Sequence, residues 1–159
     1  MILEVALLSN NTFADRKNRV IIMEQKLGRT ANIVQHKGVE IIISDYTGLN
    51  GLELTETLKE NTRAIATKMI GRRDCVVVSV FKNCLLTEES VQYIAKIQKA
   101  MDGMFVATAV VGMSAIQKAA IEITGALKKS SFVTGFFENQ EDAVDWVAEE
   151  YKKFANRIR

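Results

Sequence analysis

The sequence contains no proline, one histidine and two cysteines, and each of these scarcities excludes some chemistry. Without proline, the breaks between elements must be read from Gly, Asn, Ser and Asp. Cys75 and Cys84 have no CxxC spacing and His36 is the only imidazole, so the usual ligands of a zinc or redox centre are missing. We therefore expect no metal and no cofactor, and two isolated thiols suit a reducing cytoplasm.

Long apolar runs and a one-sided charge are also lacking. The nearest candidate, residues 105–113, is much shorter than the roughly 18 apolar residues that a membrane span needs. Residues 1–8 include Glu4 and no basic leading segment, which is atypical of a signal peptide. Lys and Arg number 21 against 19 Asp and Glu, so composition favours no binding to nucleic acid. We expect a cytoplasmic protein that does not span a membrane.

The common catalytic motifs are absent as well. No GxGxxG follows an expected strand and no GxxxxGK[ST] occurs, which disfavours a dedicated nucleotide enzyme. Gly112-Met113-Ser114 begins like a nucleophile elbow but lacks the second glycine, so capping of the next helix by Ser114 is favoured. Glu88 and Glu89 are helical neighbours that point about 100° apart, a poor geometry for an acid–base pair. We predict that the chain is not an enzyme.

The residues that are present suffice for one α/β domain. At 159 residues, folding buries about 70% of the unfolded surface. Apolar, β-branched runs at residues 75–81 and 105–111 predict strands covered on both faces by helices. Lys37-Gly38 predicts the turn of a β-hairpin over residues 33–44. Apolar stripes and capping residues predict a last strand at 132–137 and helices at 54–71, 87–102, 114–123 and 139–158. The expected fold is a mixed, mostly parallel sheet with an amino-terminal hairpin and flanking helices.

The first 30 residues are interpreted as an arm and a helix packed on the domain formed by residues 31–159. Phe13, Val20 and Leu27 recur at helical spacing up to Gly28, which predicts the helix. Residues 1–8 are too apolar to remain in solvent, so the arm either seals a homodimer or packs across the sheet.

Three stretches carry a resemblance to a known family: GVEIIISDYTGL at 38–49, ATAVVGMS at 107–114 and FFENQEDAVDW at 136–146. Over residues 32–150 the chain resembles the SpoIIAA-like branch of the STAS superfamily, the sulphate-transporter and anti-sigma-factor-antagonist fold. The resemblance implies a signalling domain that binds a protein. It also implies phosphorylation at the start of the helix after the central strand, where Thr87 and Ser90 stand.

The polar residues expected at the carboxyl ends of the strands form the candidate binding site. Ligands of open α/β sheets usually sit at that edge. The candidates are Asp45, Tyr46, Thr47, Lys82, Asn83 and Ser114. We predict a non-catalytic regulatory or binding domain that engages a protein partner or a small ligand there. The alternative is a carrier or small enzyme that holds a hydrophobic, lipid-like ligand between helices and sheet, favoured by a core rich in Met and Phe.

Overall fold

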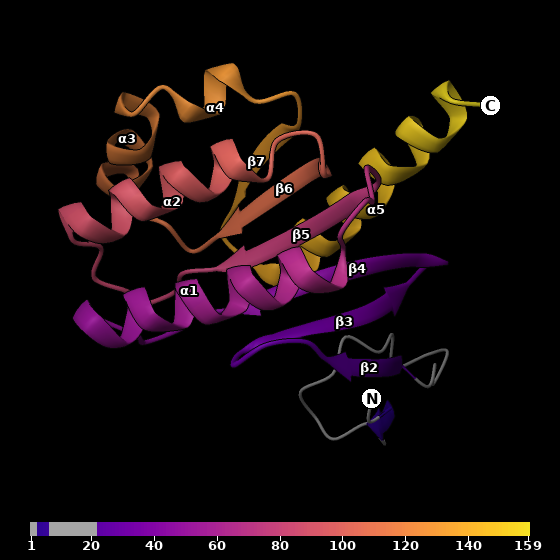
Figure 1. Cartoon of the computed structure of the whole chain (residues 1–159), viewed down its shortest axis with the longest axis horizontal. Coiled ribbons are helices and arrows are strands. Elements are labelled where there is room, and N and C mark those ends of the chain that lie inside the picture. The colour runs from indigo at the N-terminus through magenta and orange to yellow at the C-terminus, as the bar shows by residue number, and fades with distance from the viewer. Residues whose placement is uncertain (1–2, 7–21) are drawn as a thin grey trace.

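One mixed sheet of seven strands runs through the residues that the computed structural model describes, 3–6 and 22–159 (Figure 1). The strands lie side by side in chain order: β1 (Leu3–Ala6), β2 (Ile22–Lys26), β3 (Ala31–His36), β4 (Val39–Asp45), β5 (Cys75–Val80), β6 (Phe105–Val111) and β7 (Val133–Phe137). Neighbours from β1 to β4 are antiparallel, and neighbours from β4 to β7 are parallel. The predicted mixed α/β fold is confirmed, and its antiparallel part extends beyond the single hairpin expected.

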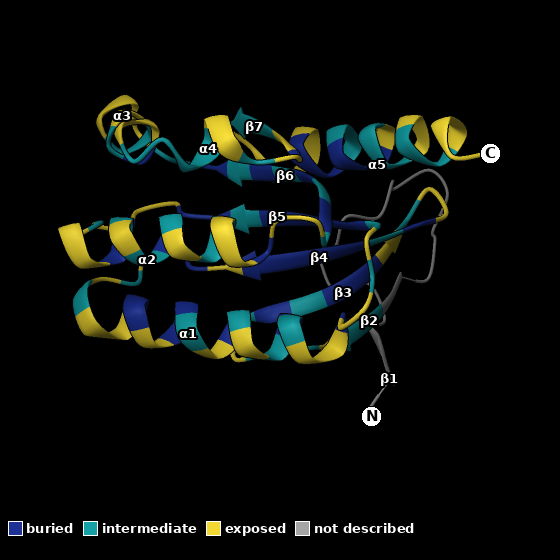
Figure 2. Ribbon diagram, turned by 45° about the horizontal axis from the view of Figure 1, so that its top comes forward, coloured by how far each residue is buried: buried dark blue, intermediate teal, exposed yellow. Residues whose placement is uncertain are grey.

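Helices cover both faces of the sheet. They are α1 (Gly51–Lys68), α2 (Glu88–Ala100), α3 (Ala115–Ile123), α4 (Ala126–Lys129) and α5 (Gln140–Arg157). Figures 1 and 2 show α1 and α2 on one face and α5 on the other. Because parallel strands need crossover connections, α1, α2 and the pair α3–α4 each join two consecutive parallel strands. The short helix α4 is not predicted by the sequence pattern.

The two apolar runs form neighbouring strands, as predicted. Val76 and Val78 of β5 are 0% exposed and face α5, while Val77 belongs to the cluster on the side of α1 and α2. On β6, by contrast, alternate residues stay half-buried, including Thr108 and Val110. The expectation that residues 105–111 are covered on both faces is therefore only partly met, because Thr108 and Val110 lie against a cavity.

Side-chain caps begin three of the predicted helices, namely α2, α3 and α5. Ser114 Oγ accepts a hydrogen bond from the Gln117 N–H at 3.2 Å, and Gln117 Oε1 accepts one from the Ser114 N–H at 3.0 Å. Asn139 Oδ1 accepts a hydrogen bond from the Asp142 N–H at 2.9 Å. The prediction that Ser114 is a helix cap is confirmed.

The helix predicted up to Gly28 is wrong over residues 22–27. Residues 22–26 form β2, which pairs with both β1 and β3. A short apolar run is compatible with both the helical and the strand period. Here pairing with the neighbouring strands selects the strand conformation. Gly28 is not a helix end but a close contact: a Cβ there would lie 2.7 Å from Asn61 Oδ1 of α1. The earlier part of the predicted helix falls within residues 7–21, outside the described residues.

Among residues 3–6 and 22–159, no helix combines the length and apolar character that crossing a membrane requires. The same part of the chain gathers no three His, Cys, Asp or Glu side chains in a metal-binding arrangement.

Candidate functional site

The carboxyl ends of β4, β5 and β6 form one edge of the sheet. Asp45 is in register with Val80, and Val80 with Val111, so the loops that follow these strands are neighbours. Helices α1, α2 and α3 begin at this same edge (Figure 1). Five of the candidate residues lie in these loops or at a strand end and are exposed: Asp45, Thr47, Lys82, Asn83 and Ser114. We call these five residues the rim.

Local hydrogen bonds hold the rim in shape. The hydroxyl and the backbone N–H of Thr47 both donate to Asp45 Oδ1, at 2.5 and 2.9 Å. Gly112 has a positive φ of 80°, and a Cβ there would lie 2.5 Å from Lys82 Cγ and 3.1 Å from Lys82 N. The loops after β5 and β6 therefore touch only because residue 112 has no side chain.

Tyr46 differs from the rim because its side chain points inward. It is 4% exposed, and its ring stacks on Phe81 with centroids 5.0 Å apart. Burial raises the pKa of the Tyr46 phenol, and Asn61 and Ser44 only partly offset this effect. Tyr46 therefore belongs to the interior as a neutral phenol.

Thr87 and Ser90 form a capping box at the start of α2. The Thr87 N–H donates to Ser90 Oγ at 2.7 Å, and the Ser90 N–H donates to Thr87 Oγ1 at 3.2 Å. Thr87 is exposed, whereas Ser90 is 1% exposed. Of the two candidates for phosphorylation, Thr87 is thus the one that a kinase could reach without opening the helix start.

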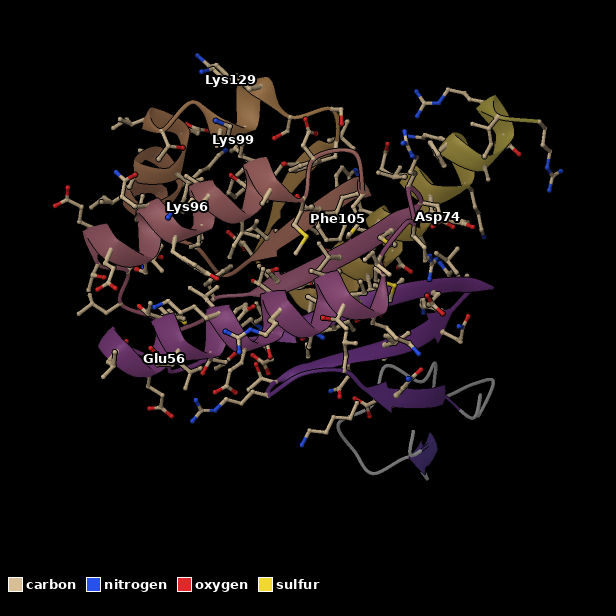
Figure 3. The ribbon with its side chains drawn as sticks, viewed as in Figure 1. Glu56, Asp74, Lys96, Lys99, Phe105 and Lys129 are labelled. Carbon is tan, nitrogen blue, oxygen red and sulfur yellow. The ribbon has the colours of Figure 1, made fainter. Side chains whose placement is uncertain are left out.

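A cavity of about 90 Å³ lies between α1, α2 and the sheet. It runs from Tyr46, Phe81 and Met113, next to the rim, to Phe105 at the start of β6. Figure 3 labels Phe105 at that end. The remaining lining residues are Ser44, Leu58, Thr62, Ile65, Val77, Ser79, Ile94, Ile97, Gln98, Met101, Thr108, Val110, Ile121, Phe132 and Phe136. The lining contains hydroxyl and amide groups but no carboxylate, ammonium, guanidinium or imidazole group.

Two polar atoms in this lining lack a hydrogen-bond partner. Ser44 Oγ, on β4, and Gln98 Oε1, on α2, are the buried side-chain oxygen or nitrogen atoms of the described residues that have none. Ser44 lies close enough to the Tyr46 hydroxyl to lower the pKa of that phenol, but no hydrogen bond of acceptable geometry reaches Ser44 Oγ. An unpaired buried polar group costs about 1–3 kcal/mol. A ligand that bonded to these oxygens would recover part of that energy.

The polar residues of the cavity were not among the predicted site residues, although the sequence contains two signals for them. Ser44 and Ser79 interrupt apolar strands, and register places them opposite each other on β4 and β5. Gln98 stands four residues after Ile94 on the apolar stripe of α2, where an apolar residue is expected. A polar residue at such a position indicates that a polar group faces the interior of the protein.

The sequence matches no known family model and no curated protein. Among solved structures, the chain is similar to an uncharacterised protein of the DUF3478 family with a SpoIIAA-like fold from Shewanella loihica PV-4. That match has a TM-score of 0.57 and 18% identity, and it covers 79% of this chain and 98% of that one. A STAS-domain anti-sigma-factor antagonist from Planctomyces limnophilus matches with a TM-score of 0.49 and 13% identity, over 74% of this chain and 97% of that one. The chain thus has the SpoIIAA-like fold that its motifs predict.

Proposed function

We propose that this chain is a non-catalytic binding domain that holds a small ligand in the cavity between α1, α2 and the sheet. The observation that carries the proposal is the pair of unpartnered oxygens, Ser44 Oγ and Gln98 Oε1, in a mostly apolar lining. Small-molecule sites commonly combine an apolar wall with a few convergent polar groups. The cavity has that composition.

The chemistry of the lining suits binding better than catalysis. General acid–base catalysis needs a group that titrates near the working pH, and the lining supplies hydroxyls and amides instead. Cys84 lies near the rim, but burial raises the pKa of its thiol and its Sγ donates to the Tyr46 carbonyl at 2.7 Å. A thiol in that state is a poor nucleophile.

The cavity and the rim share structural elements, which supports a regulatory role. Tyr46 lies between Asp45 and Thr47, and Phe81 and Met113 directly precede Lys82 and Ser114. A ligand that displaces these inward side chains would act on the loops that carry the rim. Ligand binding in the cavity would in this way change the shape of the rim, the surface to which a partner would bind.

A protein partner at the rim is the second candidate function, and one observation favours it. Leu52, Leu85 and Ile116 are 73%, 67% and 83% exposed near the starts of α1, α2 and α3. Asn50 Oδ1 accepts a hydrogen bond from the Leu85 N–H at 2.7 Å, which brings the first two of these segments together. Exposed apolar side chains beside polar ones are typical of protein interfaces.

Binding in the cavity is tested with toluene as the probe and two matched variants. We expect toluene to shift the amide resonances of lining residues in the ¹H–¹⁵N spectrum of the native chain. Val110→Phe fills the cavity and should abolish these shifts, because Val110 is part of the lining. Val133→Phe adds the same volume at a residue that is 46% exposed and should leave them unchanged. Shifts confined to residues outside the lining would contradict the proposal.

Partner binding is tested by affinity purification and quantitative mass spectrometry from cell extract. The double variant Leu85→Ser and Ile116→Ser should reduce recovery of a specific partner about tenfold, the loss typical of removing central contacts. The double variant Ile123→Ser and Ile158→Ser removes two side chains that are equally apolar and 85% and 69% exposed. An equal loss of recovery with both double variants would mean that the partner does not bind at the rim.

A further inference from the structure

We infer that the ligand of this cavity is a compact, neutral molecule with a hydrogen-bond-donating hydroxyl or amide N–H directed at Gln98 Oε1 and Ser44 Oγ. This inference rests on the proposed function and adds the chemical class of the ligand. It combines three properties of the site, namely the identity of the unpartnered atoms, the absence of charge in the lining, and the volume.

The unpartnered atoms determine which group the ligand carries. Gln98 Oε1 is an amide carbonyl oxygen and can only accept a hydrogen bond, while Ser44 Oγ can donate and accept. The two atoms come from opposite walls, β4 and α2. Ser44 is 1% exposed, so bulk solvent does not satisfy its hydroxyl. A hydroxyl group on the ligand can donate to Gln98 Oε1 or exchange a hydrogen bond with Ser44 Oγ, and an amide N–H can donate to either oxygen.

The charges around the cavity exclude an anionic ligand. A buried carboxylate or phosphate is costly unless it is paired with a cation. Lys96 and Lys99 of α2 are exposed and are not part of the lining (Figure 3). Lys118 lies over the ring of Phe136, 4.6 Å from its centroid, and pairs with Glu122 at 4.0 Å, again outside the lining. A fatty acid or a phosphate ester would find no counter-charge here.

The volume favours a compact ligand over a long chain. At about 90 Å³ the cavity is well above the space that one water requires, about 10–15 Å³. It is also well below the roughly 300–1,000 Å³ of sites for drug-sized ligands. The size fits a single ring or a short branched chain, and it argues against the lipid-like ligand considered from the sequence.

Two isomers, benzyl alcohol and anisole, provide the test. They have the same atoms, but only benzyl alcohol donates a hydrogen bond. Their Kd values are measured by titration calorimetry or ¹H–¹⁵N shifts with the native chain and with Gln98→Met, which keeps the volume and removes the acceptor. Because the isomers differ in hydration, the quantity compared is the change in each Kd between native chain and variant.

We expect Gln98→Met to raise the Kd of benzyl alcohol about five- to tenfold, as the loss of one hydrogen bond implies. The Kd of anisole should rise by less than about twofold. Ser44→Ala should also raise the Kd of benzyl alcohol. Equal changes for both isomers would overturn the inference and indicate that the two oxygens bind water only. A larger loss for anisole would mean that an amide N–H, not the carbonyl, faces the ligand.

The remaining outcomes separate this inference from the proposed function. If benzoate binds the native chain more tightly than benzyl alcohol does, the ligand is anionic and the inference is wrong, although the cavity is still a binding site. If neither isomer nor toluene binds the native chain, the proposed function fails and the inference fails with it.

Discussion

His36 Nε2 lies 2.7 Å from Asp145 Oδ1, so the turn between β3 and β4 is tied to α5. Lys37 Nζ lies 2.9 Å from the same oxygen. Burial raises the pKa of Asp145, but the hydrogen bonds from His36 and Lys37 together outweigh burial, and the pKa is lowered overall. This cluster joins the antiparallel part of the sheet to the helix on the face opposite the cavity.

Asp145→Asn is therefore expected to reduce the pH dependence of stability in acid. An aspartate with a lowered pKa stabilises the fold above its unfolded pKa of about 3.9, and this contribution is lost as pH falls through the folded pKa. The effect should be below about 1 kcal/mol, because the pair is partly exposed. Urea unfolding at pH 7 and at acidic pH measures it, with the exposed Glu141→Gln on the same helix as control. A variant with the native acid dependence would show that the cluster contributes nothing.

Gly112→Ala should destabilise the protein more than Gly103→Ala. Both glycines have positive φ, 80° and 88°, so both substitutions carry backbone strain. Only at Gly112 would the new Cβ collide with Lys82, since nothing lies within 4 Å of a Cβ at Gly103. We expect an additional loss of about 1–3 kcal/mol and shifted amide resonances at Lys82 and Asn83. Equal destabilisation in thermal unfolding would mean that the rim loops can separate freely.

Several elements could be predicted from local pattern, whereas others depend on tertiary contacts. The β-branched runs of β5 and β6 and the cap at Ser114 are encoded by neighbouring residues, and their predictions are confirmed. Strand β2 is not encoded in this way, because its strand conformation results from pairing with β1 and β3. Local propensity is a weak guide where a short segment fits both periods.

The same distinction applies to the candidate site, where the rim could be predicted from the sequence and the cavity could not. Rim residues follow strand ends directly, so the order of elements suffices to place them at one edge. The cavity oxygens belong to residues 54 positions apart, Ser44 and Gln98, and only the packing of α2 on the sheet brings them to one cavity. The order of elements does not predict which way each side chain points. Tyr46 is an example, since its neighbours Asp45 and Thr47 are exposed and its own ring is buried.

Thr87→Ala is expected to cost about 1 kcal/mol of stability through the loss of the helix cap, whereas Thr87→Ser should retain the cap. Chemical unfolding of the two variants measures the difference, and equal losses would contradict the capping role. Phosphorylation at this position stays a prediction. Peptide mapping of protein from its native source should find phosphate on Thr87 and not on Ser90, which is 1% exposed.

Removal of residues 1–9 should change the oligomeric state or the solubility of the protein. Deletion of β1 leaves β2 as an edge strand with unpaired N–H and C=O groups. Light scattering and thermal unfolding measure the result, and a chain lacking only residues 1–2 is the control, because it keeps β1. Identical behaviour of both truncated chains would show that the arm neither seals a homodimer nor supports the sheet.

The central claim, that an apolar cavity exists between α1, α2 and the sheet, is tested most directly by a crystal structure determined under xenon pressure. Xenon enters apolar cavities of this kind. We predict a xenon site enclosed by Ser44, Val77, Gln98 and Phe105. Side chains that close this space, with no xenon bound between helices and sheet, would contradict it.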